Sequence, residues 1–135
     1  MLSWKPLLFI PLALLLIGCS KKSGPATATV KGKITLDSAT MASGKITFED
    51  PTPGIPAVTI DVKDGMYEGS VPVGKKTVRI ESFKLLDPPK NGMKGEMYEK
   101  KIEQNFLPAK YNTASTISKE VVSGSNAFDF EVTSK

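Results

Sequence analysis

The sequence predicts an all-β protein, folded as a sandwich of about seven short strands. From residue 27 onward, apolar and polar residues alternate with a period of two, which is the pattern of strands that bury one face. Turn signals separate the alternating segments at intervals of roughly 8–12 residues, as they do in sandwich domains. One of these signals is Asp64-Gly65, a dipeptide that favours the positive φ angles of a tight hairpin turn.

Three strands are expected in the first half of the sandwich, within residues 29–37, 45–50 and 57–63. Their inward residues are Val30, Gly32, Ile34 and Leu36 in the first strand, Ile46 and Phe48 in the second, and Val58, Ile60 and Val62 in the third. Residues 51–56 hold three prolines, which cannot donate ladder hydrogen bonds, so this stretch is a predicted loop.

The second half adds strands on both sides of a long irregular stretch. Residues 66–83 hold two strands, with a bend expected at Pro72 and a tight turn at Gly74. Residues 115–132 hold two more strands, joined by a Gly-Ser-Asn turn. The inward residues are Val78 and Ile80 in the first part, and Phe128, Phe130 and Val132 in the second.

The irregular stretch, residues 84–105, is charged and contains two prolines and two glycines. Tyr98, Ile102 and Phe106 recur at helical spacing, so a short helix is one interpretation. We favour the other, a long loop with at most one or two helical turns. Loops of this length are usually functional or disordered.

The N-terminus predicts a secretory signal, residues 1–18, because Lys5 precedes a continuous apolar run in residues 7–17. The uncharged stretch is shorter than the roughly 20 residues that a membrane-spanning helix needs. The predicted signal ends in Leu16, Ile17 and Gly18, and Cys19 follows it directly. This tetrapeptide resembles the lipobox of bacterial lipoproteins, in which the cysteine sulfur receives a diacylglyceryl group and a peptidase cuts just before the cysteine.

The lipobox resemblance implies a mature protein that is held at a membrane by lipid on Cys19, with no further cysteine for disulfides. Residues 19–27 are small and polar and are expected to form a flexible tether, in which Lys21 and Lys22 either contact anionic head groups or only keep the tether soluble. In proteobacterial lipoproteins an aspartate after the cysteine retains the protein in the inner membrane. Ser20 stands at that position here, so the resemblance favours the outer membrane.

Residues 28–135 resemble the carboxypeptidase regulatory-like, or transthyretin-like, domain of small bacterial lipoproteins. The resemblance rests on VKGKITLD and GKITF, on DGMYEGSVPVGKKTVRI, and on LPAKYN with EVVSGSNAFDFEV near the C-terminus. It implies a seven-stranded Greek-key β-sandwich. Tyr67 and Tyr111 lie in these motifs, and we expect each at the edge of the core with a hydroxyl group that needs a hydrogen-bond partner.

Composition excludes several kinds of chemistry. The 135-residue chain has a net charge of +4 and no histidine, so Ser-His-Asp and Cys-His catalysis and histidine-based zinc sites are ruled out. A transthyretin-like hydrolase that the family contains depends on histidines and on a C-terminal tetrapeptide, and this chain has neither. The lysines are dispersed and Arg79 is the single arginine, which does not fit nucleic-acid binding. We expect no enzyme activity, no cofactor and no bound metal.

Carboxylates are the remaining chemical groups. Glu49 and Asp50 lie at a strand end, and Asp61, Asp64 and Glu68 lie around the predicted hairpin. Such groups bind calcium or act as an acid–base pair in other proteins. Their spacing is not that of an EF-hand, and a solvated sheet edge explains them as well.

These observations favour a lipid-anchored envelope protein that binds or scaffolds, through an exposed sheet edge that an extended peptide can join or through residues 85–104. Its partner is then an envelope protein or a glycan. The alternative is a carbohydrate- or small-ligand-binding module, for which Tyr98, Phe106 and Tyr111 are the available aromatic residues. A third class, a hydrolase, would use Asp61, Asp64 or Glu68.

Overall fold

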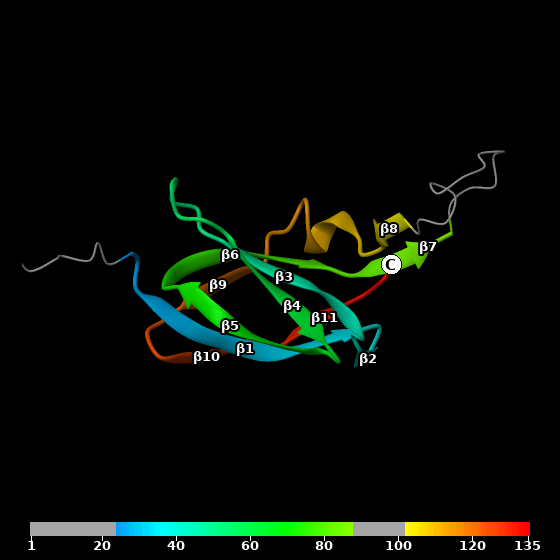
Figure 1. Cartoon of the computed structure of the whole chain (residues 1–135), viewed down its shortest axis with the longest axis horizontal. Helices are drawn as coiled ribbons and strands as arrows, with labels where there is room; N and C mark the ends of the chain where they lie inside the picture. The colour runs from blue at the N-terminus through cyan, green and yellow to red at the C-terminus, as the bar shows by residue number, and fades with distance from the viewer. Residues whose placement is uncertain (1–23, 88–101) are drawn as a thin grey trace, which may run out of the picture.

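The computed structural model describes residues 24–87 and 102–135, and this part of the chain is all-β (Figure 1). The elements are β1 (Thr27–Leu36), β2 (Ala39–Thr40), β3 (Ser43–Glu49), β4 (Val58–Lys63), β5 (Met66–Pro72), β6 (Gly74–Glu81), β7 (Phe83–Leu86), β8 (Ile102–Asn105), the 3-10 helix η2 (Ala109–Tyr111), β9 (Ser118–Val121), β10 (Ser125–Ala127) and β11 (Phe130–Val132).

Nine of these strands form one curled sheet. Its order is β10-β1-β5-β4-β3-β6-β9, and β2 and β11 pair with β1 beyond this path. The curl places β1 and β5 opposite β3 and β6, so the fold is sandwich-like (Figure 1). The rings of Phe48 on β3 and Tyr67 on β5 pack against each other, with 6.2 Å between their centroids. The all-β prediction is confirmed, and the seven-stranded Greek-key arrangement stays a prediction.

The core lies between the two halves of the curled sheet. Its buried apolar residues are Ala28, Val30, Ile34, Met41, Ile46, Phe48, Val62, Tyr67, Val71, Val78, Ile80, Leu107, Val121 and Val132. Most of them occupy the inward positions that the period-two pattern predicts. Burial of each large apolar side chain contributes about 1.5–3 kcal/mol to folding.

Three predicted turn signals are confirmed, and they form two turns. Asp64 and Gly65 both have positive φ angles, 50° and 73°, as a two-residue hairpin turn requires. Pro72 ends β5, and Gly74 begins β6 with a φ of 115°. The first turn joins β4 to β5, whereas the second carries the chain to a strand that pairs with β3 and β9 rather than with β5.

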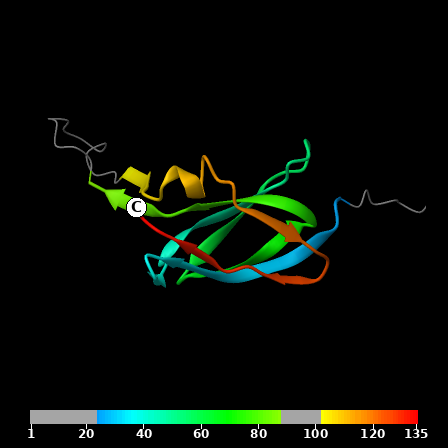
Figure 2. The ribbon, with the colours of Figure 1, turned by 180° about the vertical axis from the view of Figure 1, so that it is seen from behind.

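The C-terminal strands run beside β1 and parallel to it (Figure 2). Val30 pairs with Asn126 on β10, and Ile34 pairs with Phe130 on β11. The offset between partners is the same in both pairs (126 − 30 = 130 − 34), so the ladder is interrupted between β10 and β11 without a change of register.

The range 84–105 differs from the expected loop at both ends. Strands β7 and β8 form a separate two-stranded sheet, in which Phe83 pairs with Asn105 and Leu86 pairs with Ile102. Residue 102 therefore begins a strand rather than continuing a helix. The middle of this range, together with Tyr98, lies outside the described residues.

The predicted signal, Cys19 and most of the tether also lie outside the described residues. Within residues 24–87 and 102–135, no helix has the length and apolar character that a membrane crossing needs.

Candidate functional site

Strands β4 and β5 leave the Asp64-Gly65 turn together and then separate (Figure 1). Their pairing is limited to Lys63 with Met66, although β4 pairs with β3 along its length and β5 pairs with β1 along its length. The result is an open seam, which we define as the gap between residues 58–62 of β4 and residues 67–71 of β5.

The edge of β4 that faces this seam carries free backbone groups. Residues that flank a two-residue hairpin turn exchange both backbone hydrogen bonds, so Lys63 and Met66 point at each other. The backbone N–H and C=O groups of successive residues point to opposite edges of a strand. Asp61 and Thr59, which are two and four residues before Lys63, therefore also direct these groups into the seam. The N–H of Asp64 donates in the opposite direction, to the carbonyl group just before β3 (2.9 Å), as this alternation requires.

The facing edge belongs to β5. By the same alternation, Glu68 and Ser70 direct their backbone groups into the seam, while the residues between them pair with β1. In the described part of the chain, no hydrogen bond outside the regular ladders uses these groups of β4 or β5. The seam is thus bordered by two unpaired strand edges.

Side chains explain why the ladder stops. If pairing continued from Lys63 and Met66, Asp61 would face Glu68, and like charges directly opposite each other destabilise a sheet. Ile60 would face Gly69, and a Cβ atom on Gly69 would lie 2.5 Å from Ile60 Cδ1. Ile60 therefore fills the inner side of the seam and closes the core without a backbone ladder.

A groove of about 730 Å3 opens on the solvent face of this region. The residues that line it are Lys31, Gly32, Lys33, Ile60, Asp61, Lys63, Met66, Tyr67, Glu68, Ala127 and Asp129. The strand register places the charged residues of the groove at neighbouring positions. Lys33 and Lys63 both pair with Met66, and Lys31 pairs with Glu68. We call this the seam groove.

The floor of the seam groove is built where the ladder between β1 and the C-terminal strands is interrupted. The Tyr67 hydroxyl donates to the carbonyl oxygen of Phe128 (2.6 Å), and the Lys33 N–H donates to Asp129 Oδ1 (2.8 Å). Gly32 is required here, because a Cβ atom would lie 1.8 Å from the Phe128 oxygen. Burial first, and the charge of Asp129 second, raise the pKa of Tyr67 above its ordinary value.

The charges around the groove are not neutralised by close ion pairs. In residues 24–87 and 102–135, ion pairs join Lys76 to Asp50 and Arg79 to Glu49, and no groove residue takes part in one. Asp61 and Glu68 are exposed at the seam, and Met66 has 57% of its surface exposed. The groove therefore offers carboxylates, ammonium groups and an apolar side chain to a ligand.

The opposite seam of the sandwich, between β9 and β10, is closed by contrast. The side chain of Asn126 accepts from the Val122 N–H (3.0 Å) and donates to the carbonyl oxygens of Val122 (2.8 Å) and Thr29 (3.2 Å). The Lys119 ammonium group lies over the Phe128 ring, 5.5 Å from its centroid. In the described part of the chain, these contacts tie the end of β9 to β10, whereas β4 and β5 have no such bridge beyond Lys63 and Met66.

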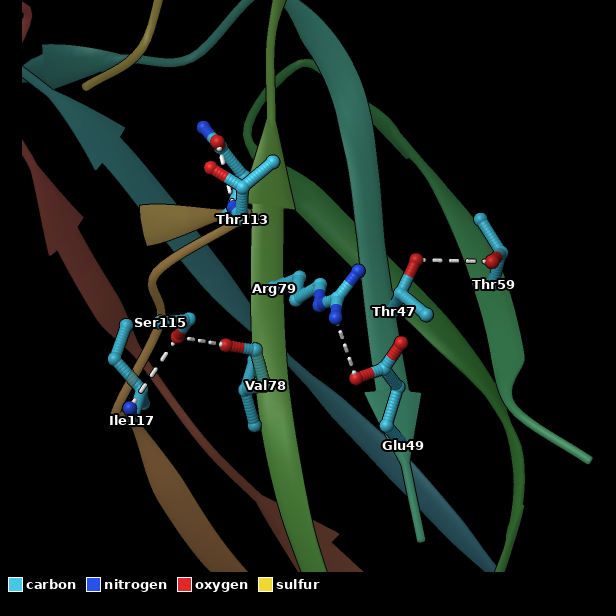
Figure 3. A network of polar contacts seen from close by, with 9 residues as sticks. Thr47, Glu49, Thr59, Val78, Arg79, Thr113, Ser115 and Ile117 are labelled. Atoms are coloured by element: carbon cyan, nitrogen blue, oxygen red, sulfur yellow. Dashed lines mark hydrogen bonds and ion pairs between the residues drawn. The ribbon is translucent and has the colours of Figure 1, made fainter. Parts of the chain in front are cut away.

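The five acidic candidates do not form one site, because three of them lie at or beside the seam groove and two form ion pairs elsewhere. Asp61 and Glu68 line the seam groove, and Asp64 lies in the turn beside it. Glu49 forms an exposed ion pair with Arg79 (3.0 Å), which Figure 3 shows on neighbouring strands. The solvated-edge interpretation is wrong for Asp50, because that carboxylate pairs with a buried lysine. Among the described residues, no three acidic or sulfur ligands gather as a metal site.

Two of the three aromatic candidates, Phe106 and Tyr111, lie among the described residues, and they do not form an open platform. Phe106 is half-buried against the core, and Lys84 lies over its ring at 4.2 Å. Tyr111 is also half-buried, and its hydroxyl group bonds to Thr133 (3.2 Å). The expected hydroxyl partners of both Tyr67 and Tyr111 are thus confirmed.

Sequence reasoning missed Lys76, whose side chain is buried. The signal was present in the pattern, because Lys76 shares the inward phase of Val78 and Ile80 on β6. Its partner, Asp50, is 26 residues away, and no local pattern points from one to the other.

Comparison with known proteins identifies no family by sequence, since no protein-family model and no curated protein sequence matches the chain. Solved structures to which the chain is similar include two proteins of the DUF3823 family. The one from Parabacteroides merdae is 11% identical over 81% of this chain and 47% of its own, with a TM-score of 0.45. The one from Bacteroides ovatus is 16% identical over 79% of this chain and 44% of its own, with a TM-score of 0.42. The chain thus spans less than half of either protein.

Proposed function

We propose that this protein is a lipid-anchored, non-catalytic binding module of the bacterial cell envelope, and that it takes up its partner in the seam groove. The anchor is inferred from the lipobox-like residues that end at Cys19. The observation that carries the binding role is the seam groove, where two free strand edges meet exposed carboxylates and Met66.

The position of the groove supports this arrangement. The tether, residues 19–27, reaches at most about 30 Å from a lipid. It joins the domain at the start of β1, whereas the groove is lined by Lys31 and Lys33, roughly 13–20 Å further along that strand. The groove thus lies toward the end of β1 that is remote from the anchor, where a partner has access.

The carbohydrate alternative receives less support from the described residues. A glycan platform needs an exposed aromatic face, and the rings of Phe106 and Tyr111 carry Lys84 and Lys110 over them. We therefore place an envelope protein before a glycan as the partner.

The anchor is tested by the intact mass of the protein purified from detergent-solubilised membranes. We expect the mass of residues 19–135 plus lipid, and its loss in a Cys19→Ser variant. An unlipidated mature chain in the wild type would overturn the anchor.

The binding role is tested by photocrosslinking in intact cells, with a photoreactive residue in place of Met66. The matched control position is Val122, which is equally exposed (57% for each) but lies outside the groove. We expect a discrete crosslinked product from position 66 and none from position 122. Equal products from both positions, or none from position 66, would refute the groove as the binding surface.

A further inference from the structure

Strand β9 is the last strand of the large sheet, and its outer edge has no ladder partner in the described part of the chain. An exposed edge of this kind can pair with the same edge of another copy, so natural sheets carry features that prevent it. We propose that Lys119 guards this edge, and that without its charge the protein associates with a second copy of itself through β9. This inference does not depend on the seam groove.

The backbone of β9 shows which groups remain available for pairing. The Val78 N–H on β6 donates to the carbonyl oxygen of Ile117 (2.8 Å), so Ile117 and every second residue after it direct their backbone groups to β6. Ser118 and Glu120 therefore direct N–H and C=O to the outer edge. Within residues 24–87 and 102–135, no backbone hydrogen bond outside the regular ladders uses these groups.

The side chain of Asn126 closes this edge at one point only. Its Oδ1 atom accepts the Val122 N–H (3.0 Å), and its Nδ2 atom donates to the Val122 carbonyl oxygen (2.8 Å). A neighbouring strand would make the same two kinds of hydrogen bond, so Asn126 takes the place of a strand at Val122. Residues 118–120 lie before this bridge and remain open.

Lys119 lies between the two open residues, and its side chain points inward. It shares the inward phase of Ile117 and Val121, which pack in the core. Its ammonium group lies over the rings of Phe128 and Phe130, 5.5 and 5.6 Å from their centroids. Lys119 is therefore a charged residue in an inward row whose neighbours are apolar.

The inward charge opposes the addition of a strand. A strand that joined the β9 edge would extend the sheet over the two phenylalanine rings and cover the half-buried Lys119 ammonium group. In the described part of the chain, no carboxylate forms an ion pair with Lys119. The ammonium group would thus lose water without gaining an anion, which is unfavourable. Inward-pointing charges on edge strands prevent sheet association in this way.

A second copy of β9 is the partner that fits the edge once this charge is removed. Two copies that meet about a two-fold axis at Ser118 pair Glu120 with Thr116. The same register places residue 119 beside Ile117 of the other copy. No like charges oppose each other in that register, whereas an axis at Glu120 would place two carboxylates face to face.

The test compares Lys119→Met with the wild type by sedimentation equilibrium, both as full-length protein in density-matched detergent. Methionine keeps an unbranched side chain over the rings and removes the charge. We expect the variant to form dimers or larger assemblies at a concentration at which the wild type does not. Lys119→Arg keeps the charge and should match the wild type. Lys75→Met is the matched control, because it removes an exposed lysine from the neighbouring strand, and it should also match the wild type.

A second pair of measurements assigns the association to the edge of β9. Glu120→Pro in the Lys119→Met background removes an N–H that points outward and spares the ladder with β6. It should weaken the association by about tenfold or more. If this double variant fails to fold, a photoreactive residue in place of Ser118 serves instead. We expect it to crosslink two copies of Lys119→Met, and a photoreactive residue in place of Thr59 on β4 to crosslink none.

The guard role is wrong if Lys119→Met associates no more than the wild type, or if Lys75→Met associates equally. It is also wrong if the association is insensitive to Glu120→Pro or, where that variant does not fold, gives no product from position 118. Circular dichroism shows whether each variant is folded, and Lys119→Gln replaces Lys119→Met if the latter is not. Failure of both to fold would show that the charge stabilises the monomer itself, which also overturns the guard role.

Discussion

The Nζ atom of Lys76 contacts the carboxylate of Asp50, and only 1% and 7% of these two side chains are exposed to solvent. Lys76 also donates to the Val73 carbonyl oxygen (3.2 Å), and Asp50 accepts the Thr52 N–H (2.8 Å). The pair therefore ties the end of β3 to the start of β6 and fixes the beginning of the proline-rich loop. Separation of two buried charges leaves each without compensation, so the pair acts as a unit.

Substitution of Lys76 by Met should lower the free energy of unfolding by about 3 kcal/mol, because the Asp50 carboxylate then remains in a poorly solvated site without a cation. Urea denaturation measures this change. Arg79→Met is the matched control, since it removes the neighbouring ion pair with Glu49, whose side chains are 41% and 34% exposed. Figure 3 shows this contact between β3 and β6. Arg79→Met should cost less than about 1 kcal/mol. Equal losses would contradict the assigned role of burial.

The double variant Lys76→Met with Asp50→Leu should recover much of the stability that Lys76→Met loses. Replacement of a whole buried ion pair by apolar side chains is often neutral, whereas removal of one partner is not. Urea denaturation of the two single variants and the double variant completes a thermodynamic cycle. Additive losses would mean that the two charges do not depend on each other.

Acid should weaken the fold through the same pair. The hydrogen bond from Lys76 first, and that from the Thr52 N–H second, lower the pKa of Asp50 from 3.8 to about 2. The folded state therefore binds the proton less tightly than the unfolded state. This contribution to stability is complete above about pH 4 and is lost as the pH falls toward about 2. Unfolding free energies across this window should vary less steeply with pH in Asp50→Asn and in Lys76→Met. An unchanged slope in either variant would count against the assignment.

The all-β fold was predictable because its signals are local. Alternation places the side chains of β1, β3 and β6 on one face or the other, and the Asp64-Gly65 dipeptide specifies its turn. The acidic residues on both sides of that turn were recognised as candidates for the same reason. They are close in sequence, and a hairpin brings them together.

Long-range relationships were not predictable from these signals. Alternation gives the same pattern for paired and for open strands, so it does not show that β4 and β5 separate after one pair. The parallel pairing of β10 and β11 with β1 joins segments 96 residues apart (126 − 30 = 96). The charge and prolines of residues 84–105 indicate a loop. The two ends of this range nevertheless form strands, because β7 and β8 pair with each other, and local sequence preference does not show such pairing.

Alkaline pH should reveal the different environments of two tyrosines. Burial raises the pKa of Tyr67, so the unfolded chain releases this proton first and stability falls as the pH rises above about 10. A hydrogen bond with Thr133 lowers the pKa of Tyr111, which gives the opposite sign. Tyr67→Phe should therefore reduce the alkaline loss of stability, and Tyr111→Phe should increase it. Chemical denaturation across this pH range measures both, and the same direction of change in both variants would refute the assignment.

Gly32 should tolerate no side chain, because the floor of the seam groove depends on close approach of two backbones. A Cβ atom at this position would lie 1.8 Å from the carbonyl oxygen of Phe128, which also accepts the Tyr67 hydroxyl hydrogen bond. Relief of this clash requires β1 and the C-terminal strands to move apart and breaks that bond. Gly32→Ala should lower the free energy of unfolding by about 3 kcal/mol, at the upper end of overpacking effects. Gly24→Ala is the control, since its Cβ atom meets no atom within 4 Å, and it should change stability by less than about 0.5 kcal/mol. Thermal and urea denaturation compare the two variants. A Gly32→Ala protein as stable as Gly24→Ala would mean that the C-terminal strands do not approach β1 as closely as the structure places them.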